Sequence, residues 1–208
     1  MTVAHALLGF ALVSGLLTIV PGLDTAYVLR TAISRGRGHA YAAALGINAG
    51  CLVWGVAAAV GATAVLTASE TAYRALTLAG AAYMVVLGVS MVRAGSRPRS
   101  DVVVDAPRWS PWRTFLAGLG TNLLNPKIGV FYLATIPAFI PAGVSPLAMG
   151  VALAVVHNVI GMAWFSVIIL ATGYAGRWLR DARVSRITDR VTGGVLIVFG
   201  GRLALSAR

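Results

Sequence analysis

The sequence predicts an all-α membrane protein with six transmembrane helices, arranged as two inverted repeats of three. Its 208 residues are 58% hydrophobic and 11% charged, with a mean hydropathy of +0.83. Soluble domains carry about 25% charged residues, so this composition excludes an ordinary water-soluble protein. Six apolar runs reach the length of about 20 residues that a bilayer requires. Arginine gathers in alternate connections between these runs, as in multi-pass membrane proteins.

The predicted spans follow one another along the whole chain. The first apolar run has no basic residues ahead of it and is longer than the apolar core of a signal peptide. We therefore expect a helix there and not a removed leader. In chain order the spans cover residues 5–34, 40–66, 72–92, 114–140, 147–171 and 187–205.

The distribution of arginine predicts the orientation in the membrane. The fourth connection has no basic residue and the second has only Arg74. The positive-inside rule therefore places the first, third and fifth connections in the cytoplasm and both termini outside. The net charge of +11 raises nucleic acid as a partner, but short basic clusters between apolar runs favour a lipid bilayer and no nucleic acid. The clusters are Arg30, Arg35 and Arg37; Arg93, Arg97, Arg99, Arg108 and Arg113; and Arg177, Arg180, Arg183, Arg186 and Arg190.

The two halves of the chain resemble each other. The stretches "GLLTIVPGLDTAYVL" and "GTNLLNPKIGVFYLA" each have a glycine six residues before a proline and a tyrosine six residues after it. Three spans per half would invert the second half relative to the first, and such repeats place substrate sites at broken helices near the midplane. The predicted divisions are a first repeat at 1–94, a cytoplasmic linker at 95–112 and a second repeat at 113–208.

Proline is expected to break the first and fourth helices. Pro21 and Pro126 lack an N–H and clash with the preceding turn, and Gly22 loosens the first break further. Each proline can open a new half-helix whose free N–H groups favour an anion. Irregular backbone at membrane depth occurs only inside protein or along a wet cavity. A packing kink explains one such proline; two at matched positions beside charges favour a binding site.

Asp24 and Lys127, the only lysine, lie next to these breaks. Each charge costs roughly 2.5–3.5 kcal/mol at the centre of a membrane helix, so such residues commonly line substrate paths or proton relays. The alternative is a structural ion pair that holds the first helix to the fourth. The two interpretations are compatible if the pair opens when substrate enters.

Polar and aromatic residues near the breaks complete the predicted substrate or ion site. The asparagines could line a cavity or bridge helices, and the tyrosines could form cavity walls or simply pack. His157 could carry protons or be a buried, hydrogen-bonded residue, and Cys51 is expected to be a small buried hydrophobe. No metal site is predicted. The candidates besides Asp24, Lys127, Pro21, Gly22 and Pro126 are Asn48, Asn122, Asn125, Asn158, Tyr27, Tyr132 and His157.

The motifs at residues 20–50 and 122–140 resemble the LysE/RhtB family of bacterial amino-acid exporters, over essentially the whole chain. The resemblance implies a multi-pass protein of the bacterial inner membrane that exports amino acids or similar metabolites and needs no cofactor. It also implies that the proton-motive force drives export, with Na⁺ coupling as an alternative. This chain has Pro21-Gly22-Leu23 where the family often has Pro-Gly-Pro, so its substrate preference is not carried over.

These residues suggest a transport cycle. A zwitterionic amino acid would enter from the cytoplasm, with its carboxylate at Pro126 and Lys127 and its ammonium at Asp24. Protonation of Asp24 from outside would release it, and rocking of one half against the other would give alternating access. Glycine-rich faces such as Gly46 to Gly50 are compatible with packing within one chain or in a homo-oligomer.

Two other classes of function are weaker alternatives. A membrane-embedded enzyme would need paired carboxylates, a metal set or a nucleophile with its base. A metal-ion transporter would need several acidic or sulfur ligands. A single aspartate beside a lysine suits neither, so we expect a transporter of zwitterions and not an enzyme.

Overall fold

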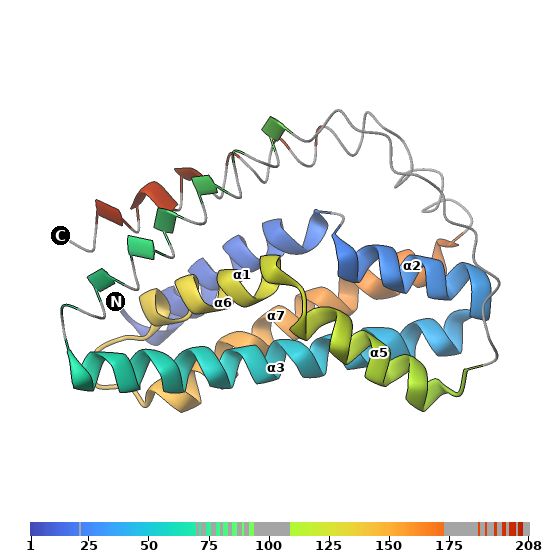
Figure 1. Ribbon diagram of the computed structural model, residues 1–208, viewed down its shortest axis with the longest axis horizontal. Helices are drawn as coiled ribbons and strands as arrows, with labels where there is room; N and C mark the ends of the chain where they lie inside the picture. Colours follow the sequence, from blue (N-terminus) through green and yellow to red (C-terminus); the bar gives the residue numbers. More distant parts are fainter. Residues whose placement is uncertain are drawn as a thin grey trace.

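The computed structural model describes residues 1–20, 22–69 and 109–172 continuously, with isolated positions between 71 and 93 and between 187 and 205 (Figure 1). Regular structure in this described part is helical throughout. The helices are α1 (Val3–Ile19), α2 (Leu23–Arg35), α3 (Arg37–Ala68), α5 (Pro111–Leu123), α6 (Pro126–Thr135), the 3-10 helix η1 (Pro137–Phe139) and α7 (Pro146–Leu170).

Two or three of the six predicted spans coincide with helices that are long and apolar enough to cross a membrane. Within the described residues, Arg37–Gly61 and Pro146–Leu170 are long and apolar enough to span a bilayer, with mean hydropathies of 1.8 and 2.1. The bent pair of α1 and α2 makes a third candidate. The predicted spans at 72–92 and 187–205 are described only at isolated positions, and most of the predicted linker lies outside the described residues. Six spans and an inverted repeat therefore stay predictions.

The first predicted break is present. Helix α1 ends at Ile19, α2 begins at Leu23, and their axes differ by 54°. Val20 has an extended backbone at the end of α1, and Gly22 is the N-cap of α2. The predicted span at 5–34 is therefore two helices joined at an angle.

The second predicted break is also present. Helix α5 ends at Leu123, and α6 begins at Pro126. Asn125 caps α6, because its side-chain oxygen accepts a hydrogen bond from the backbone N–H of Lys127 at 3.1 Å. Helix α5 has 13 residues and α6 has 10, so neither alone reaches across a bilayer.

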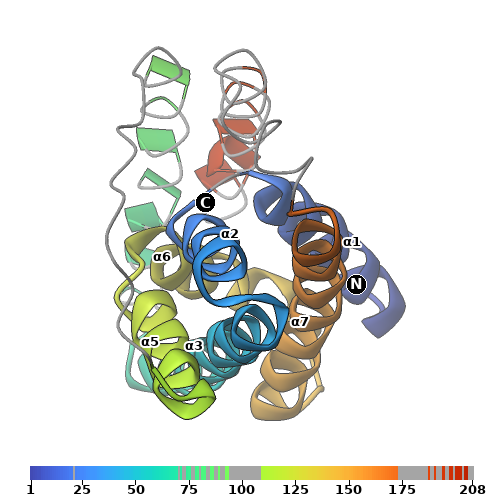
Figure 2. The ribbon, with the colours of Figure 1, turned by 90° about the vertical axis from the view of Figure 1, so that its right-hand side faces the viewer.

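Helix α3 packs against α2, α5 and α7, and Figure 2 shows it between α5 and α7. Glycines allow the closest of these approaches. A Cβ atom on Gly46 would overlap the carbonyl oxygen of Phe115 on α5, and one on Gly118 would overlap that of Ala43 on α3. The backbones of α3 and α5 are thus in direct contact, as small residues permit in membrane bundles.

Side chains of these helices form two apolar clusters among the described residues. One cluster contains Phe10, Phe131 and Leu153 from α1, α6 and α7. The other contains Val28 and Ile168 from α2 and α7, together with residues of α3. The polar residues at the helix breaks lie between these clusters.

The described ends of the arginine-rich connections lie at one end of the bundle. Figure 1 shows the end of α2, the start of α3, the start of α5 and the end of α7 together there. A guanidinium N–H of Arg37 donates a hydrogen bond to the carbonyl oxygen of Leu170 at 3.4 Å, which joins the start of α3 to the end of α7. The first, third and fifth connections therefore begin or end on the same side.

Candidate functional site

A cavity of about 40 Å³ lies where the two helix breaks meet. Residues of α1, α2, α3, α6 and α7 line it, so it lies where five helices meet. The cavity brings together several of the residues predicted from the sequence. These are Gly22, Asp24, Asn48, Asn125, Lys127 and His157, and the other lining residues are Leu17, Thr18, Val20, Thr25, Ile47, Cys51, Ile128, Gly161 and Phe165.

Asp24 lies in the first turn of α2 and is only 8% exposed. Its Oδ2 atom accepts a hydrogen bond from Nδ2 of Asn122 at 2.8 Å. Its Oδ1 atom is buried and has no hydrogen-bond partner within the described part of the chain. The position is favourable for a carboxylate, because the N-terminus of a helix carries partial positive charge. One carboxylate oxygen therefore remains available to a ligand in the cavity.

Lys127 on α6 reaches across to the end of α1. Its Nζ atom donates hydrogen bonds to the carbonyl oxygens of Leu17 at 3.2 Å and Val20 at 3.4 Å. In an uninterrupted helix, the N–H of residue 21 would donate to Leu17, but Pro21 has no N–H. The lysine thus satisfies a carbonyl that the proline leaves unpaired. Carbonyls at the C-terminal end of a helix also favour a cation.

Asn122 makes the corresponding connection in the other direction. It lies four residues before Pro126, as Leu17 lies four residues before Pro21. Its side chain bonds to Asp24, just after the first break, and also approaches the sulfur of Cys51 at 3.5 Å. Each break therefore receives a polar contact from the segment around the other.

His157 on α7 is bonded through both ring nitrogens. Nδ1 lies 2.8 Å from the hydroxyl of Tyr132, and Nε2 lies 3.1 Å from the hydroxyl of Thr18. Thr18 donates its own hydrogen to the carbonyl of Ser14 at 2.8 Å, so its oxygen accepts from Nε2–H. Nε2 therefore carries a proton, and the hydroxyl of Tyr132 is the partner of Nδ1. His157 thereby connects α1, α6 and α7.

The remaining predicted polar residues bridge helices around the cavity. Nδ2 of Asn158 donates to the carbonyl oxygen of Asn48 at 3.0 Å, which joins α7 to α3. Oδ1 of Asn158 is buried and has no hydrogen-bond partner among the described residues. Asn48 itself lines the cavity.

The two predicted tyrosines lie outside the cavity lining. The hydroxyl of Tyr27 donates to the carbonyl oxygen of Thr114 on α5 at 3.2 Å, at some distance along α2 from the break. Tyr132 is fully buried in the apolar cluster, and its ring stacks on that of His157 with 5.6 Å between centroids. Pro126 begins α6, and Pro21 lies outside the described residues.

Several site residues were not singled out from the sequence. Thr18 and Thr25 contribute hydroxyls to the cavity, and Cys51 contributes its thiol side chain. Ser14 and Thr18 lie four residues apart on α1 and so share one face of that helix. That spacing of hydroxyls in an otherwise apolar helix was the available signal.

The cavity combines opposite charges with polar backbone at two helix breaks. It is lined by the carboxylate of Asp24, the ammonium of Lys127 and the backbone around two helix breaks. Among the described residues, no three His, Cys, Asp or Glu side chains gather as metal ligands would. The arrangement is suited to a small ligand that itself carries both a cation and an anion.

Comparison with known proteins identifies one family and several relatives. Residues 15–207 match the family described as LysE type translocator. The chain is 31% identical to the threonine efflux protein of Escherichia coli, with 89% of this chain and 91% of the relative covered. It is 31% identical to the homoserine/homoserine lactone efflux protein of Salmonella typhi, covering 96% and 95%. It is 26% identical to the uncharacterized membrane protein YrhP of Bacillus subtilis, covering 97% and 100%. No solved structure matches the chain.

Proposed function

Because this chain belongs to the LysE type translocator family, we propose that it is a secondary exporter of amino acids or closely related metabolites from the cytoplasm. The main observation in support of this function is that Asp24 and Lys127 line one cavity at two helix breaks. The threonine and homoserine efflux relatives support a small amino-acid-type substrate. An enzyme or a metal-ion transporter receives no such support.

The charges in the cavity suit the two ends of a zwitterion. The substrate's ammonium would bind Oδ1 of Asp24, which has no hydrogen-bond partner within the described residues. Its carboxylate would bind the ammonium of Lys127 at the start of α6, where the partial positive charge of the helix N-terminus also favours an anion. Charge-assisted hydrogen bonds of this kind are roughly twice as strong as neutral ones.

Substrate binding must widen the cavity. A volume of about 40 Å³ holds about three water molecules, which is less than an amino acid occupies. The site as it stands is therefore too small for the proposed substrate. Widening requires Lys127 to leave the carbonyls of Leu17 and Val20, and the substrate's carboxylate would provide its new partner. The release of this contact would let the two halves move, as alternating access demands.

Proton antiport would use Asp24. With the substrate's ammonium bound, the carboxylate is charged and paired. Protonation from the outer side removes that charge and weakens the hold on the ammonium, so the substrate leaves. The proton then returns with the empty carrier and is released to the cytoplasm, which restores the carboxylate for the next substrate.

We propose the membrane arrangement that the sequence predicts. Six spans form two inverted repeats, at 1–94 and 113–208, in the bacterial inner membrane. Two observations support this. The contacts Lys127–Leu17 and Asn122–Asp24 run in opposite directions between matched breaks. The described ends of the arginine-rich connections also share one side of the bundle, which we assign to the cytoplasm with both termini outside.

Transport into inverted membrane vesicles tests this function. The vesicles carry the protein, an imposed proton gradient drives uptake, and mass spectrometry measures all twenty amino acids at once. Gradient-dependent accumulation of a few amino acids is expected, together with its loss in Lys127→Ala. The matched control is Leu124→Ala, since Leu124 lies beside the same break but is 83% exposed. No accumulation of any of the twenty amino acids by the wild type would contradict their export and would leave only related metabolites as substrates.

The role of Asp24 is tested in the same vesicles. Asp24→Asn keeps the shape of the side chain and its contact with Asn122 but cannot exchange a proton. We expect loss of gradient-driven uptake. Full proton-coupled export by this variant would remove Asp24 from the coupling mechanism.

A further inference from the structure

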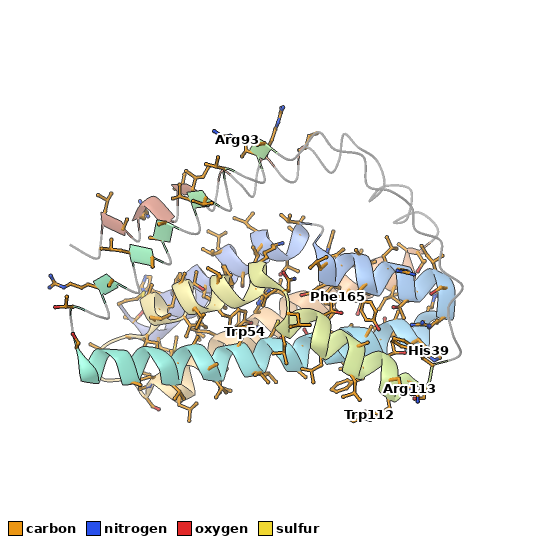
Figure 3. The ribbon with its side chains drawn as sticks, in the orientation of Figure 1. His39, Trp54, Arg93, Trp112, Arg113 and Phe165 are labelled. Carbon is orange, nitrogen blue, oxygen red and sulfur yellow. The ribbon has the colours of Figure 1, made fainter. Side chains whose placement is uncertain are left out.

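The end of the bundle that carries Arg35, Arg37 and Arg113 is distinct from the transport cavity. Arg35 is the last residue of α2, Arg37 the first of α3, and Arg113 lies in the first turn of α5. Figure 3 shows His39, Trp112 and Arg113 close together there, where α3 and α5 begin. We call Arg35, Arg37, His39, Trp109, Trp112 and Arg113 the basic end.

Trp109 organises the basic end. The guanidinium carbon of Arg35 lies 4.5 Å from the centre of the Trp109 ring, which is a cation–π contact. The ring nitrogen Nε2 of His39 lies 2.9 Å from the carbonyl oxygen of Trp109. These contacts hold α2, α3 and the start of α5 around one residue. They also fix the plane of the Arg35 guanidinium, whose N–H groups can then meet an anion without further ordering.

The positive charge of the basic end is not neutralised within the described part of the chain. Asp24 is the only acidic residue in that part, and it lies in the cavity, bonded to Asn122. Nε of Arg35 is buried and donates no hydrogen bond to any described residue. A buried donor without an acceptor costs about 1–3 kcal/mol. An anionic ligand at the guanidinium groups would balance charge that the described residues leave unbalanced.

The basic end lies at the depth of lipid headgroups. The apolar span of α3 begins at Arg37, and Arg37 contacts Leu170 where the span of α7 ends. Trp112 is 63% exposed and stacks on Phe115, with 5.1 Å between ring centroids. Exposed tryptophan at the end of a membrane helix is typical of the interface between lipid and water.

We propose that the basic end binds the phosphate of an anionic phospholipid headgroup, at the junction of α2, α3 and α5. Planar guanidinium groups match phosphate oxygens in pairs. A net negative headgroup is favoured over a zwitterionic one, because a choline or ethanolamine group would add a further cation to this end. Basic pockets on the cytoplasmic side of membrane helices bind anionic headgroups in this manner. The site does not depend on the proposed transport activity.

Native mass spectrometry of the full chain in detergent tests the site. The protein is titrated with phosphatidylglycerol and with phosphatidylcholine of the same acyl chains. We expect phosphatidylglycerol to bind at least about tenfold more tightly. We expect Arg35→Gln/Arg113→Gln to abolish that preference. The charge-matched control is Arg74→Gln/Arg202→Gln, two exposed arginines outside the basic end, and it should keep the preference.

Each possible result either supports or overturns the lipid site. Equal binding of the two lipids by the wild type, or an unchanged preference in the double variant, would overturn the proposal. Displacement of phosphatidylglycerol by excess inorganic phosphate would show a free-phosphate site and not a lipid site. Should the double variant not stay folded, Arg113→Gln serves alone, because Arg113 is exposed. That variant must then lose part of the preference, and a full preference would overturn the proposal.

Discussion

Lys127 donates a hydrogen bond from its ammonium to the carbonyl oxygen of Leu17 at 3.2 Å, across the gap between two broken helices. Leu17 is the residue whose helical partner would be the missing N–H of Pro21. The lysine beside the second break thus satisfies a backbone carbonyl at the first break. Because the same ammonium lines the cavity beside Asp24, holding the helices together and binding an anion are alternative states of one side chain.

Replacing Lys127 should therefore cost both stability and transport. In Lys127→Met the carbonyls of Leu17 and Val20 lose a charged donor, and an unpaired buried carbonyl costs about 1–3 kcal/mol. We expect a lower midpoint of thermal unfolding in detergent and at least about a tenfold loss of transport. Leu124→Met makes a comparable change at an exposed site near the same break and should be neutral. An unchanged unfolding midpoint in Lys127→Met would show that the contact does not hold the helices together.

Close packing of α3 on α5 predicts a contrast between two glycines of one helix. A Cβ on Gly46 would overlap the Phe115 carbonyl and lie 2.9 Å from the Leu119 nitrogen, whereas one on Gly61 meets nothing within 4 Å. Gly46→Ala should destabilise the protein by about 1–3 kcal/mol, since backbone cannot yield cheaply. Gly61→Ala should be neutral or slightly stabilising, because alanine favours helix. Thermal unfolding measures both, and equal effects would contradict the packing.

His157 is expected to hold the helices around the site together and not to carry the transported proton. Both of its ring nitrogens are engaged, with Tyr132 and Thr18. Tyr132→Phe removes one hydrogen bond, which contributes about 0.5–1.5 kcal/mol, while export should stay coupled to the proton gradient. His157→Gln should likewise lower the unfolding midpoint and retain gradient-dependent transport. Uptake by His157→Gln that no longer responds to the gradient would make His157 a member of the proton path.

The orientation in the membrane gives a prediction for reporter fusions. Alkaline phosphatase fused to the C-terminus should be active and green fluorescent protein should be dark, because we place that end outside. Fusions after residue 100, in the predicted cytoplasmic linker, should behave in the opposite way. The reverse pattern at both places would invert the assigned orientation.

The sequence predicted the local interruptions because these depend on residue chemistry. Pro126 cannot continue a helix, Asn125 is a favourable cap, and Gly22 supports an irregular turn, so both breaks could be located. Asp24 and Lys127 could be selected because charge within apolar runs is costly. These inferences need only neighbouring residues along the chain.

The contacts across the cavity depend on how distant helices pack. The pairing of Lys127 with Leu17 follows from the position of α6 beside the end of α1, which no local pattern specifies. Thr18 is not distinctive in the sequence, because threonine in a helix commonly bonds its own i−4 carbonyl. It does so to Ser14, and it also accepts a hydrogen bond from His157. The symmetric spacing of Tyr27 and Tyr132 from the prolines made them candidates for the site. Both lie too far along their half-helices from the breaks to line the cavity.

The central claim is that a zwitterionic amino acid binds in the cavity between the breaks, and Cys51 offers the most direct measurement. It is the only cysteine in the chain, it lines the cavity, and it lies 3.5 Å from the Asn122 nitrogen that also bonds Asp24. In this structure Cys51 is only 4% exposed and the cavity is too small for a methanethiosulfonate reagent, so the rate of Cys51 modification reports widening of the cavity. The rate is followed by mass spectrometry in reconstituted protein. The amino acid that the vesicle assay identifies is compared with its decarboxylated amine and its deaminated acid. We predict that the amino acid changes the rate severalfold while neither analogue does, and that Asp24→Asn removes the effect. The same rate with and without the amino acid, or an equal effect of all three compounds, would contradict a zwitterion site at Asp24 and Lys127.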